Sequence, residues 1–185
     1  MTDGPEPLVS HTVDASHWMS TDDLRNALET TVPDSDFRLA RTPPESTAML
    51  DSAEIVIAAF LPSTVLDSAP NLRWIQALSA GVDFFDLDAL EDREIVLTSA
   101  AGVHAEPVAE QVLGYMLLFE RRIHTGIRQQ SRTVWERYEG GEIRGKTLGI
   151  IGLGAIGERI ASYASAFDMT IIGTKRHPRD SSRCG

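Results

Sequence analysis

Short apolar runs alternate with helix-like segments over the first hundred residues of the chain. Runs rich in β-branched and aromatic residues predict strands at Phe37–Ala40, Ile55–Phe60, Leu72–Leu78 and Ile95–Thr98. Capping and proline signals predict helices from Ser20 to about Glu29, from Pro43 to Leu50, and from Leu61 to just before Pro70. Strands joined by such helices imply right-handed crossovers. The predicted fold class is therefore α/β, beginning with a flavodoxin-like parallel sheet.

A long and strongly apolar helix is predicted next, from Ala105 to about Arg122. Pro107 is tolerated in its first turn, and Glu106 and Glu110 lie where the helix dipole favours acids. Apolar residues occur almost all round this helix, so we expect it to be buried between two domains or against a second subunit. The polar, arginine-rich stretch 123–144 is interpreted as an arm or linker.

A glycine motif follows, between a buried strand at Thr147–Ile151 and a helix that ends near Phe167. The motif consists of Gly152, Leu153, Gly154, Ala155, Ile156 and Gly157. The first glycine permits a tight turn, the second lets the backbone approach a pyrophosphate, and the third lets the helix pack closely on the strand. A second strand at Met169–Thr174 completes the unit. This order predicts dinucleotide binding; the alternative is that the glycines serve only the turn.

The end of the second strand favours NADP over NAD as the cofactor. NAD-binding proteins usually place an acid there on the ribose 2′-hydroxyl, whereas this chain has Thr174, Lys175 and Arg176 and no acid. A threonine with a basic pair suits a 2′-phosphate, because Lys and Arg make strong charge-assisted hydrogen bonds to phosphate. NAD stays open as the alternative cofactor, since the same residues could form a solvated basic loop.

Charge and composition narrow the expected partners. The chain has 27 acidic and 17 basic side chains and a net charge of -10, so neither nucleic acid nor a membrane surface is expected as a partner. Its longest apolar run is far shorter than the roughly 20 residues of a membrane span, and its start lacks a secretion signal. A cytoplasmic location is expected by default. The single cysteine, Cys184, excludes a disulfide framework and a cysteine metal cage.

Three segments together resemble the D-isomer-specific 2-hydroxyacid dehydrogenases, such as glyoxylate/hydroxypyruvate reductases and phosphoglycerate dehydrogenases. They are Asn71–Asp83, Gly102–Glu110, and Gly145–Thr147 leading into the glycine motif. The resemblance implies a substrate domain over residues 1–101, an interdomain helix and arm over 102–144, and the first half of a Rossmann cofactor domain over 145–185.

The same resemblance assigns roles to three residues outside the glycine motif. Ala80 and Gly81 lie on the loop whose backbone amides receive the substrate carboxylate in the family. Val108 is placed near the nicotinamide. The alternatives are a tight turn without a ligand at Ala80 and Gly81, and a simple core position for Val108.

The resemblance also implies a catalytic arginine, histidine and acid that lie beyond the C-terminus of this chain, so no catalytic residue is assigned within it. His104 and His124 are rejected as the base: His104 precedes a helix, and His124 lies at the arginine-rich end of that helix, where a cation suits the dipole. We expect a C-terminally truncated, incomplete Rossmann domain with an uncovered sheet edge, and a marginal or aggregation-prone chain.

The function predicted from the sequence is that of an NAD(P)-dependent oxidoreductase that reduces a small 2-oxo acid. The resemblance implies a homodimer for the intact protein, and this chain is expected to be inactive alone. The alternatives are a dinucleotide-binding interaction or sensing module without turnover, and a non-functional remnant. The identity of the 2-hydroxy acid is not determined by the sequence.

Overall fold

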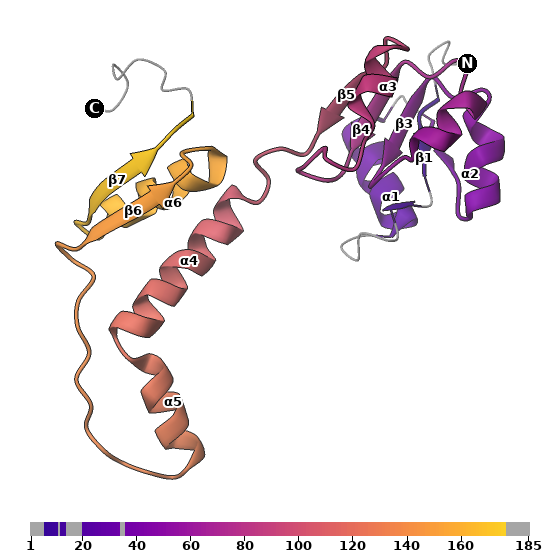
Figure 1. The fold of residues 1–185 in the computed structure, drawn as a ribbon. Helices are drawn as coiled ribbons and strands as arrows, with labels where there is room; N and C mark the ends of the chain where they lie inside the picture. The colour runs from indigo at the N-terminus through magenta and orange to yellow at the C-terminus, as the bar shows by residue number, and fades with distance from the viewer. Residues whose placement is uncertain (1–5, 11, 14–19, 34–35, 177–185) are drawn as a thin grey trace. The chain divides into compact units, whose positions relative to one another are not determined.

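A computed structural model describes residues 6–10, 12–13, 20–33 and 36–176 of the chain (Figure 1). The chain divides into two compact units, residues 1–101 and residues 102–185. Residues 177–185, which include His177 and Cys184, lie outside the described residues.

The first unit is built on a five-stranded parallel sheet with the order β2-β1-β3-β4-β5. Its strands are β1 (Leu8–Val9), β2 (Arg38–Leu39), β3 (Ile55–Ala58), β4 (Trp74–Ala77) and β5 (Val96–Ser99). This is the flavodoxin-like strand order, so the predicted fold class is confirmed. Strand β1 was absent from the predicted strands.

The helices of the first unit are α1 (Thr21–Thr31), α2 (Pro43–Leu50), the 3₁₀ helix η2 (Ser63–Ser68) and α3 (Leu87–Glu91). The helix predicted between Leu61 and Pro70 is present over Ser63–Ser68, as a 3₁₀ helix. Helix α3 was not predicted. It begins where the side chain of Asp86 accepts a hydrogen bond from the backbone N–H of Ala89, at 3.1 Å.

Two apolar clusters pack on opposite faces of this sheet. Leu8 belongs to one cluster and its neighbour Val9 to the other, as the alternation of side chains along a strand requires. The first cluster includes Leu50 of α2 and Leu90 of α3, and the second includes Leu24 of α1. Helices therefore cover both faces, and the carboxyl ends of the parallel strands share one edge.

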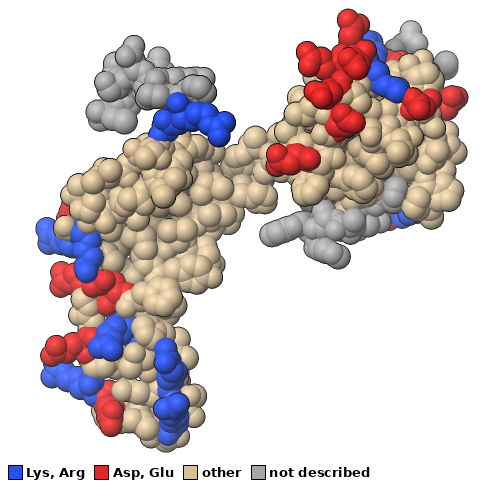
Figure 2. Space-filling view, in the orientation of Figure 1, with Lys and Arg blue, Asp and Glu red and all other residues tan. Residues whose placement is uncertain are grey.

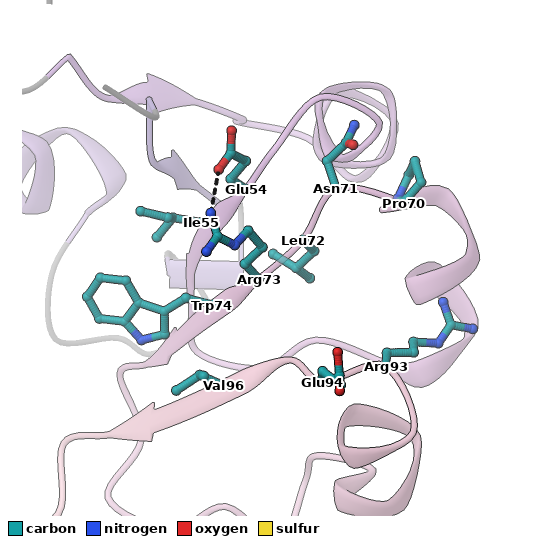
Figure 3. A pocket seen from close by; sticks show the side chains of 10 residues that line it. All are labelled: Glu54, Ile55, Pro70, Asn71, Leu72, Arg73, Trp74, Arg93, Glu94 and Val96. Carbon is teal, nitrogen blue, oxygen red and sulfur yellow. Dashed lines mark ion pairs between the residues drawn. The ribbon is translucent and has the colours of Figure 1, made fainter. Parts of the chain in front are cut away.

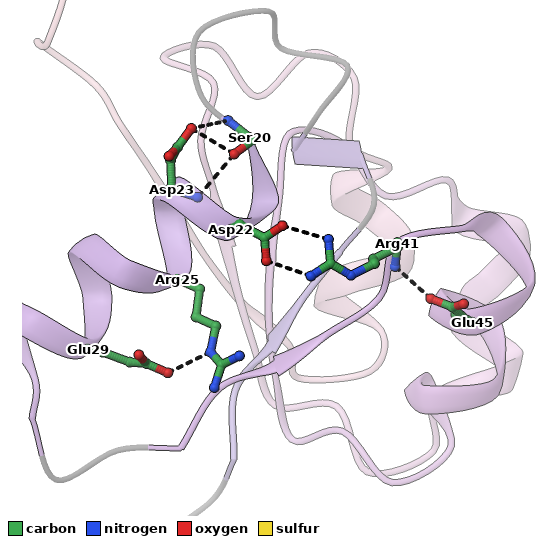
Figure 4. Close-up of polar contacts among 7 residues, drawn as sticks. All are labelled: Ser20, Asp22, Asp23, Arg25, Glu29, Arg41 and Glu45. Atoms are coloured by element: carbon green, nitrogen blue, oxygen red, sulfur yellow. Dashed lines mark hydrogen bonds and ion pairs between the residues drawn. The ribbon is translucent and has the colours of Figure 1, made fainter.

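Polar contacts fix the start of helix α1 (Figure 4). Ser20 and Asp23 form a capping box, in which the side chain of each accepts from the backbone N–H of the other. Arg41, which follows β2, donates two hydrogen bonds to the carboxylate of Asp22, at 2.7 and 2.6 Å. The bidentate pair ties α1 to the segment that leads into α2.

The Asp22–Arg41 pair predicts a pH-dependent contribution to the stability of the first unit. The hydrogen bond from Arg41 lowers the pKa of Asp22 below its usual value of about 3.9. A lowered pKa in the folded state stabilises the fold at pH values above the unfolded pKa, and this contribution is lost as the pH falls through the folded pKa. We expect Asp22→Asn to lower the urea midpoint at pH 7 and to have no effect at about pH 2.

Glu91→Gln is the matched control for this experiment, since Glu91 is an exposed helical acid with no ion pair among the described residues. An equal effect of Asp22→Asn at both pH values would contradict the assignment.

The second unit contains α4 (Ala105–Glu120), α5 (Ile123–Ser131), β6 (Thr147–Ile151), α6 (Ala155–Ser165) and β7 (Thr170–Thr174). Strands β6 and β7 are parallel neighbours joined through α6, as predicted for the glycine-motif segment. The interpretation of 123–144 as an arm was wrong over its first nine residues, which form α5. Arg122, with a φ of 54°, breaks the helical path between α4 and α5.

Helix α4 packs against α6 along one side only. Ala109 and Leu113 are buried there, whereas Tyr115 and Phe119 are 52% and 65% exposed. The strands are uncovered too: Ile151 at the end of β6 is 96% exposed. The second unit thus presents apolar surface that a lone domain would normally bury.

Among the residues that the structure describes, no helix is both long enough and apolar enough to cross a lipid bilayer.

Candidate functional site

The glycine loop joins the end of β6 to the start of α6 and is fastened to the end of β7. Gly152 has a φ of +96°, a conformation that residues with a Cβ rarely adopt. The N–H groups of Gly152 and Leu153 both donate to the carbonyl oxygen of Thr174, at 3.1 and 2.8 Å. The N–H of Gly152 is also 3.2 Å from Thr174 Oγ1, which can accept from it. The loop is therefore held in one conformation beside the strand end where a ribose would be recognised.

The second and third glycines of the motif differ in what surrounds them. A Cβ on Gly157 would lie 2.3 Å from the carbonyl oxygen of Gly152 and 3.2 Å from Ile150 Cγ2, so only glycine lets α6 approach the loop and strand so closely. A Cβ on Gly154 would meet no atom within 4 Å. The space beside Gly154 is open to a ligand, and the space at Gly157 is filled by the protein itself.

Unused backbone donors converge at the start of α6. Among the described residues, the N–H groups of Gly154, Ala155, Ile156 and Gly157 donate no hydrogen bond. Such groups carry the positive end of the helix dipole and attract anions. Together with the open space at Gly154, they form a cradle that fits a diphosphate.

Leu153 is packed across the neighbouring strand. A Cβ on Gly173 of β7 would lie 2.6 Å from Leu153 Cδ1, so the absence of a side chain at 173 makes room for Leu153. Sequence reasoning did not single out Gly173, since its partner Leu153 is 20 positions away and their contact arises only when β6 and β7 pair.

The basic residues after β7 are exposed, and one of them has an acidic partner. Lys175 Nζ lies 2.6 Å from Glu158 Oε1, and the two side chains are 39% and 60% exposed. Arg176 is exposed. The prediction that no acid is available at the end of the second strand was therefore wrong. The acid comes from α6, 17 positions earlier, and no local sequence pattern indicates that contact.

The first turn of α4, which contains Val108, is linked to α6. Glu106 accepts a hydrogen bond from the hydroxyl of Tyr163 and forms an ion pair with Arg159 at 2.6 Å. The hydrogen bond to Glu106 raises the pKa of Tyr163. Val108 is 36% exposed.

In the first unit, the segment after β4 forms a turn at the carboxyl edge of the sheet. Ser79 Oγ donates to the carbonyl oxygen of Gly81 at 2.7 Å, and the N–H groups of Ala80 and Gly81 donate no hydrogen bond among the described residues. Those two donors could receive an anionic group. Asp83 Oδ2 lies 3.3 Å from the position of a Cβ on Gly81, so an anion here also needs a cation to balance that carboxylate.

The two histidines rejected as the base from the sequence lie at the starts of helices. His104 immediately precedes α4 and makes no side-chain capping bond. His124 lies in the first turn of α5, with Nδ1 3.4 Å from the carbonyl oxygen of Leu118 and its ring 5.8 Å from that of Phe119. The described residues also contain no group of His, Cys, Asp and Glu side chains that could hold a metal ion.

A separate hollow of about 820 Å³ opens in the first unit where β3, β4 and β5 begin (Figure 3). Trp74 and Arg73 line it, and Arg73 Nη1 lies 3.6 Å from Glu54 Oε2. Ligands of open parallel sheets bind at the carboxyl ends of the strands, which is the opposite edge. We therefore assign no part of the candidate site to this hollow.

Charge is divided unequally between the two units. Residues 1–101 contain 18 Asp and Glu and 5 Lys and Arg, whereas residues 102–185 contain 9 and 12. Figure 2 shows acidic side chains gathered over the first unit. An anionic dinucleotide is therefore favoured by the unit that carries the glycine loop and disfavoured by the other.

The parallel β6–α6–β7 unit with its glycine loop is of the Rossmann class of α/β folds. Residues 113–184 match the family described as "D-isomer specific 2-hydroxyacid dehydrogenase, NAD binding domain". The predicted resemblance to the D-isomer-specific 2-hydroxyacid dehydrogenases is thereby confirmed.

Individual relatives agree with this assignment. The chain is 38% identical over 111 residues to D-3-phosphoglycerate dehydrogenase of Methanocaldococcus jannaschii, a match covering 59% of this chain and 21% of the relative. It is 37% identical over 121 residues to glyoxylate reductase of Thermofilum pendens, covering 60% and 35%. The chain thus spans well under half the length of these relatives.

A solved structure of a D-isomer specific 2-hydroxyacid dehydrogenase family protein from Aeromonas salmonicida is also similar. It has a TM-score of 0.72 and 25% identity, over 96% of this chain and 56% of that one.

Proposed function

We propose that the second unit binds a nicotinamide dinucleotide as part of an oxidoreductase of the D-2-hydroxyacid dehydrogenase type. The observation that carries the proposal is the cradle of unused N–H groups at the start of α6, beside the open space at Gly154. The match to an NAD-binding domain supports it.

Each part of the loop has a role in this proposal. Within the loop 152–157, the backbone N–H groups of residues 154–157 hold the diphosphate, and those of Gly152 and Leu153 keep the loop in place through their bonds to Thr174. Thr174, Lys175 and Arg176 receive the 2′-phosphate of NADP. The exposure of Lys175 and Arg176 leaves them accessible to such a group. NADP is accordingly the proposed cofactor in preference to NAD, and Val108 is proposed to lie near its nicotinamide.

The proposed substrate is a small 2-oxo or 2-hydroxy acid. The N–H groups of Ala80 and Gly81 are proposed to receive its carboxylate, in a substrate domain formed by residues 1–101. Residues 102–144 connect it to the cofactor domain at 145–185. The bound cofactor supplies hydride transfer between nicotinamide C4 and substrate C2, while the chain supplies binding and orientation.

We propose that this chain alone does not turn over such substrates. His104 and His124, the two histidines rejected as the base from the sequence, lie at the starts of α4 and α5. The arginine, histidine and acid that the family resemblance implies are assigned to no residue of this chain. Orientation without a proton donor leaves most of the barrier in place. Clear reduction of glyoxylate or hydroxypyruvate by the purified chain would overturn this part of the proposal.

The test of dinucleotide binding is a thermal melt of the purified chain with and without NADPH and NADH. A ligand that binds only the folded state stabilises it, by about 2.7 kcal/mol at a concentration 100 times its Kd. We expect the transition of the second unit to move upward with both dinucleotides, and further with NADPH. The absence of a shift with either one would contradict the proposed function.

A dinucleotide-dependent interaction module without turnover is the second candidate. It is favoured by the exposed apolar side chains of the second unit, among them Phe119 at 65% and Ile127 at 55% exposure. A homodimer that covers this surface is proposed in either case. A change of oligomeric state on adding dinucleotide, measured by light scattering, would favour the interaction module over the enzyme.

A further inference from the structure

Glu158 carries a negative charge to the place where a 2′-phosphate would bind. Its carboxylate comes from the first turn of α6 and lies 2.6 Å from the ammonium of Lys175, just after β7. The backbone N–H of Glu158 donates to the carbonyl of Gly154 at 2.8 Å, which anchors the residue to the glycine loop. The side chain thus reaches from the phosphate cradle to the basic pair.

We propose that Glu158 is a specificity-determining residue that restrains the preference of this site for NADP over NAD. The inference rests on the proposed function. It goes further because it assigns the relative affinity for NADP and NAD to a residue of α6, in addition to the residues at the end of β7.

Three physical effects of the Glu158 carboxylate act in the same direction. It accepts a hydrogen bond from the ammonium of Lys175, so a 2′-phosphate must compete with Glu158 for that donor. Its charge repels that phosphate at short range. It is also an acceptor of the kind that recognises the ribose 2′-hydroxyl of NAD. Removing the charge therefore weakens no interaction that NADPH makes and weakens one that NADH can use.

The size of the effect is limited by solvent. Lys175 and Glu158 are 39% and 60% exposed, and exposed ion pairs are weak and screened by salt. Lys175 can therefore leave Glu158 for a phosphate, so that the pair lowers the preference for NADP without preventing binding. The effect should be larger at low ionic strength than at high.

The experiment compares dissociation constants of NADPH and NADH for the wild-type chain and for Glu158→Gln, by nicotinamide fluorescence at low salt. We expect the ratio of the NADH to the NADPH dissociation constant to rise about threefold to tenfold in the variant. Glu120→Gln is the matched control. Glu120 forms the same kind of pair, with Lys146 at 3.0 Å, in the same unit but outside the site.

A second measurement isolates the adenosine end of the cofactor. Adenosine 2′,5′-bisphosphate and 5′-AMP differ only in the 2′-phosphate, so the ratio of their affinities should rise in Glu158→Gln as the dinucleotide ratio does. Lys175→Met should lower that ratio, and Glu158→Gln should change it less in the Lys175→Met background. That non-additivity is expected only if the two residues act on the ligand together.

The chain also permits a direct check on the ion pair. It contains two lysines, Lys146 and Lys175, so their side-chain nitrogen resonances can be assigned by one substitution each. Glu158→Gln should move the resonance of Lys175 and leave that of Lys146 in place.

The outcomes separate this inference from the proposed function. If the wild-type chain binds neither dinucleotide, the proposed function fails and the inference falls with it. If it binds them but Glu158→Gln leaves the ratio unchanged, or Glu120→Gln changes it equally, the inference alone is overturned. A raised ratio in Glu158→Gln only, with the matching result for the adenosine nucleotides, supports it.

Discussion

A Gly157→Ala variant is expected to lose about 3 kcal/mol of stability in the second unit and all measurable dinucleotide binding. The added Cβ would lie 2.3 Å from the carbonyl oxygen of Gly152, which is a backbone atom of the glycine loop. Relief requires α6 to move away from the loop, and the loop is itself tied to Thr174 by two backbone hydrogen bonds. The collision therefore damages the fold and the anion cradle together.

Two other glycines separate those two effects. Gly154→Ala adds a Cβ with no atom within 4 Å, so it should leave the melting temperature nearly unchanged while blocking close approach of the diphosphate. Gly149→Ala adds a Cβ in equally open space within β6 and should leave both properties intact. Far-UV circular dichroism melts and NADPH titrations of the three variants test this. Wild-type stability of Gly157→Ala would contradict the close approach of α6 to the carbonyl oxygen of Gly152.

In the first unit, Ile75→Ala is expected to lower the free energy of unfolding by about 4 kcal/mol. Ile75 is fully buried in β4, paired with Val56 of β3 and Leu97 of β5. An interior strand between two others cannot shift to fill the cavity without breaking hydrogen bonds on both sides. The loss should therefore lie in the upper part of the range for such substitutions.

Urea denaturation followed by circular dichroism measures this loss. Leu87→Ala is the control, since Leu87 is 51% exposed in α3 and its truncation should cost less than about 1 kcal/mol. The transition of the second unit should be unaffected by either variant. A loss at Ile75 no larger than that at Leu87 would show that β4 is not the packed centre of this unit.

Local patterns in the sequence were sufficient wherever neighbouring residues determine the conformation. The capping residue Ser20 and the prolines in the first turn of α2 mark helix starts that the structure reproduces, since capping depends on groups within one turn. The glycine motif between two strands likewise indicated β6, α6 and β7. The break at Arg122 and the helix α5 that follows it were missed, because a polar helix without buried residues resembles a linker.

The amino-acid sequence by itself determined the α/β class, the glycine loop and the resemblance to the D-2-hydroxyacid dehydrogenases. Each depends on local periodicity, turn chemistry or motif spacing. Only the tertiary structure decided which distant side chains meet. It brought Glu158 to Lys175, Leu153 over Gly173 and Glu106 to Tyr163. Contacts between residues far apart in the chain arise from how strands pair and helices pack, and this long-range geometry leaves no local signal in the sequence.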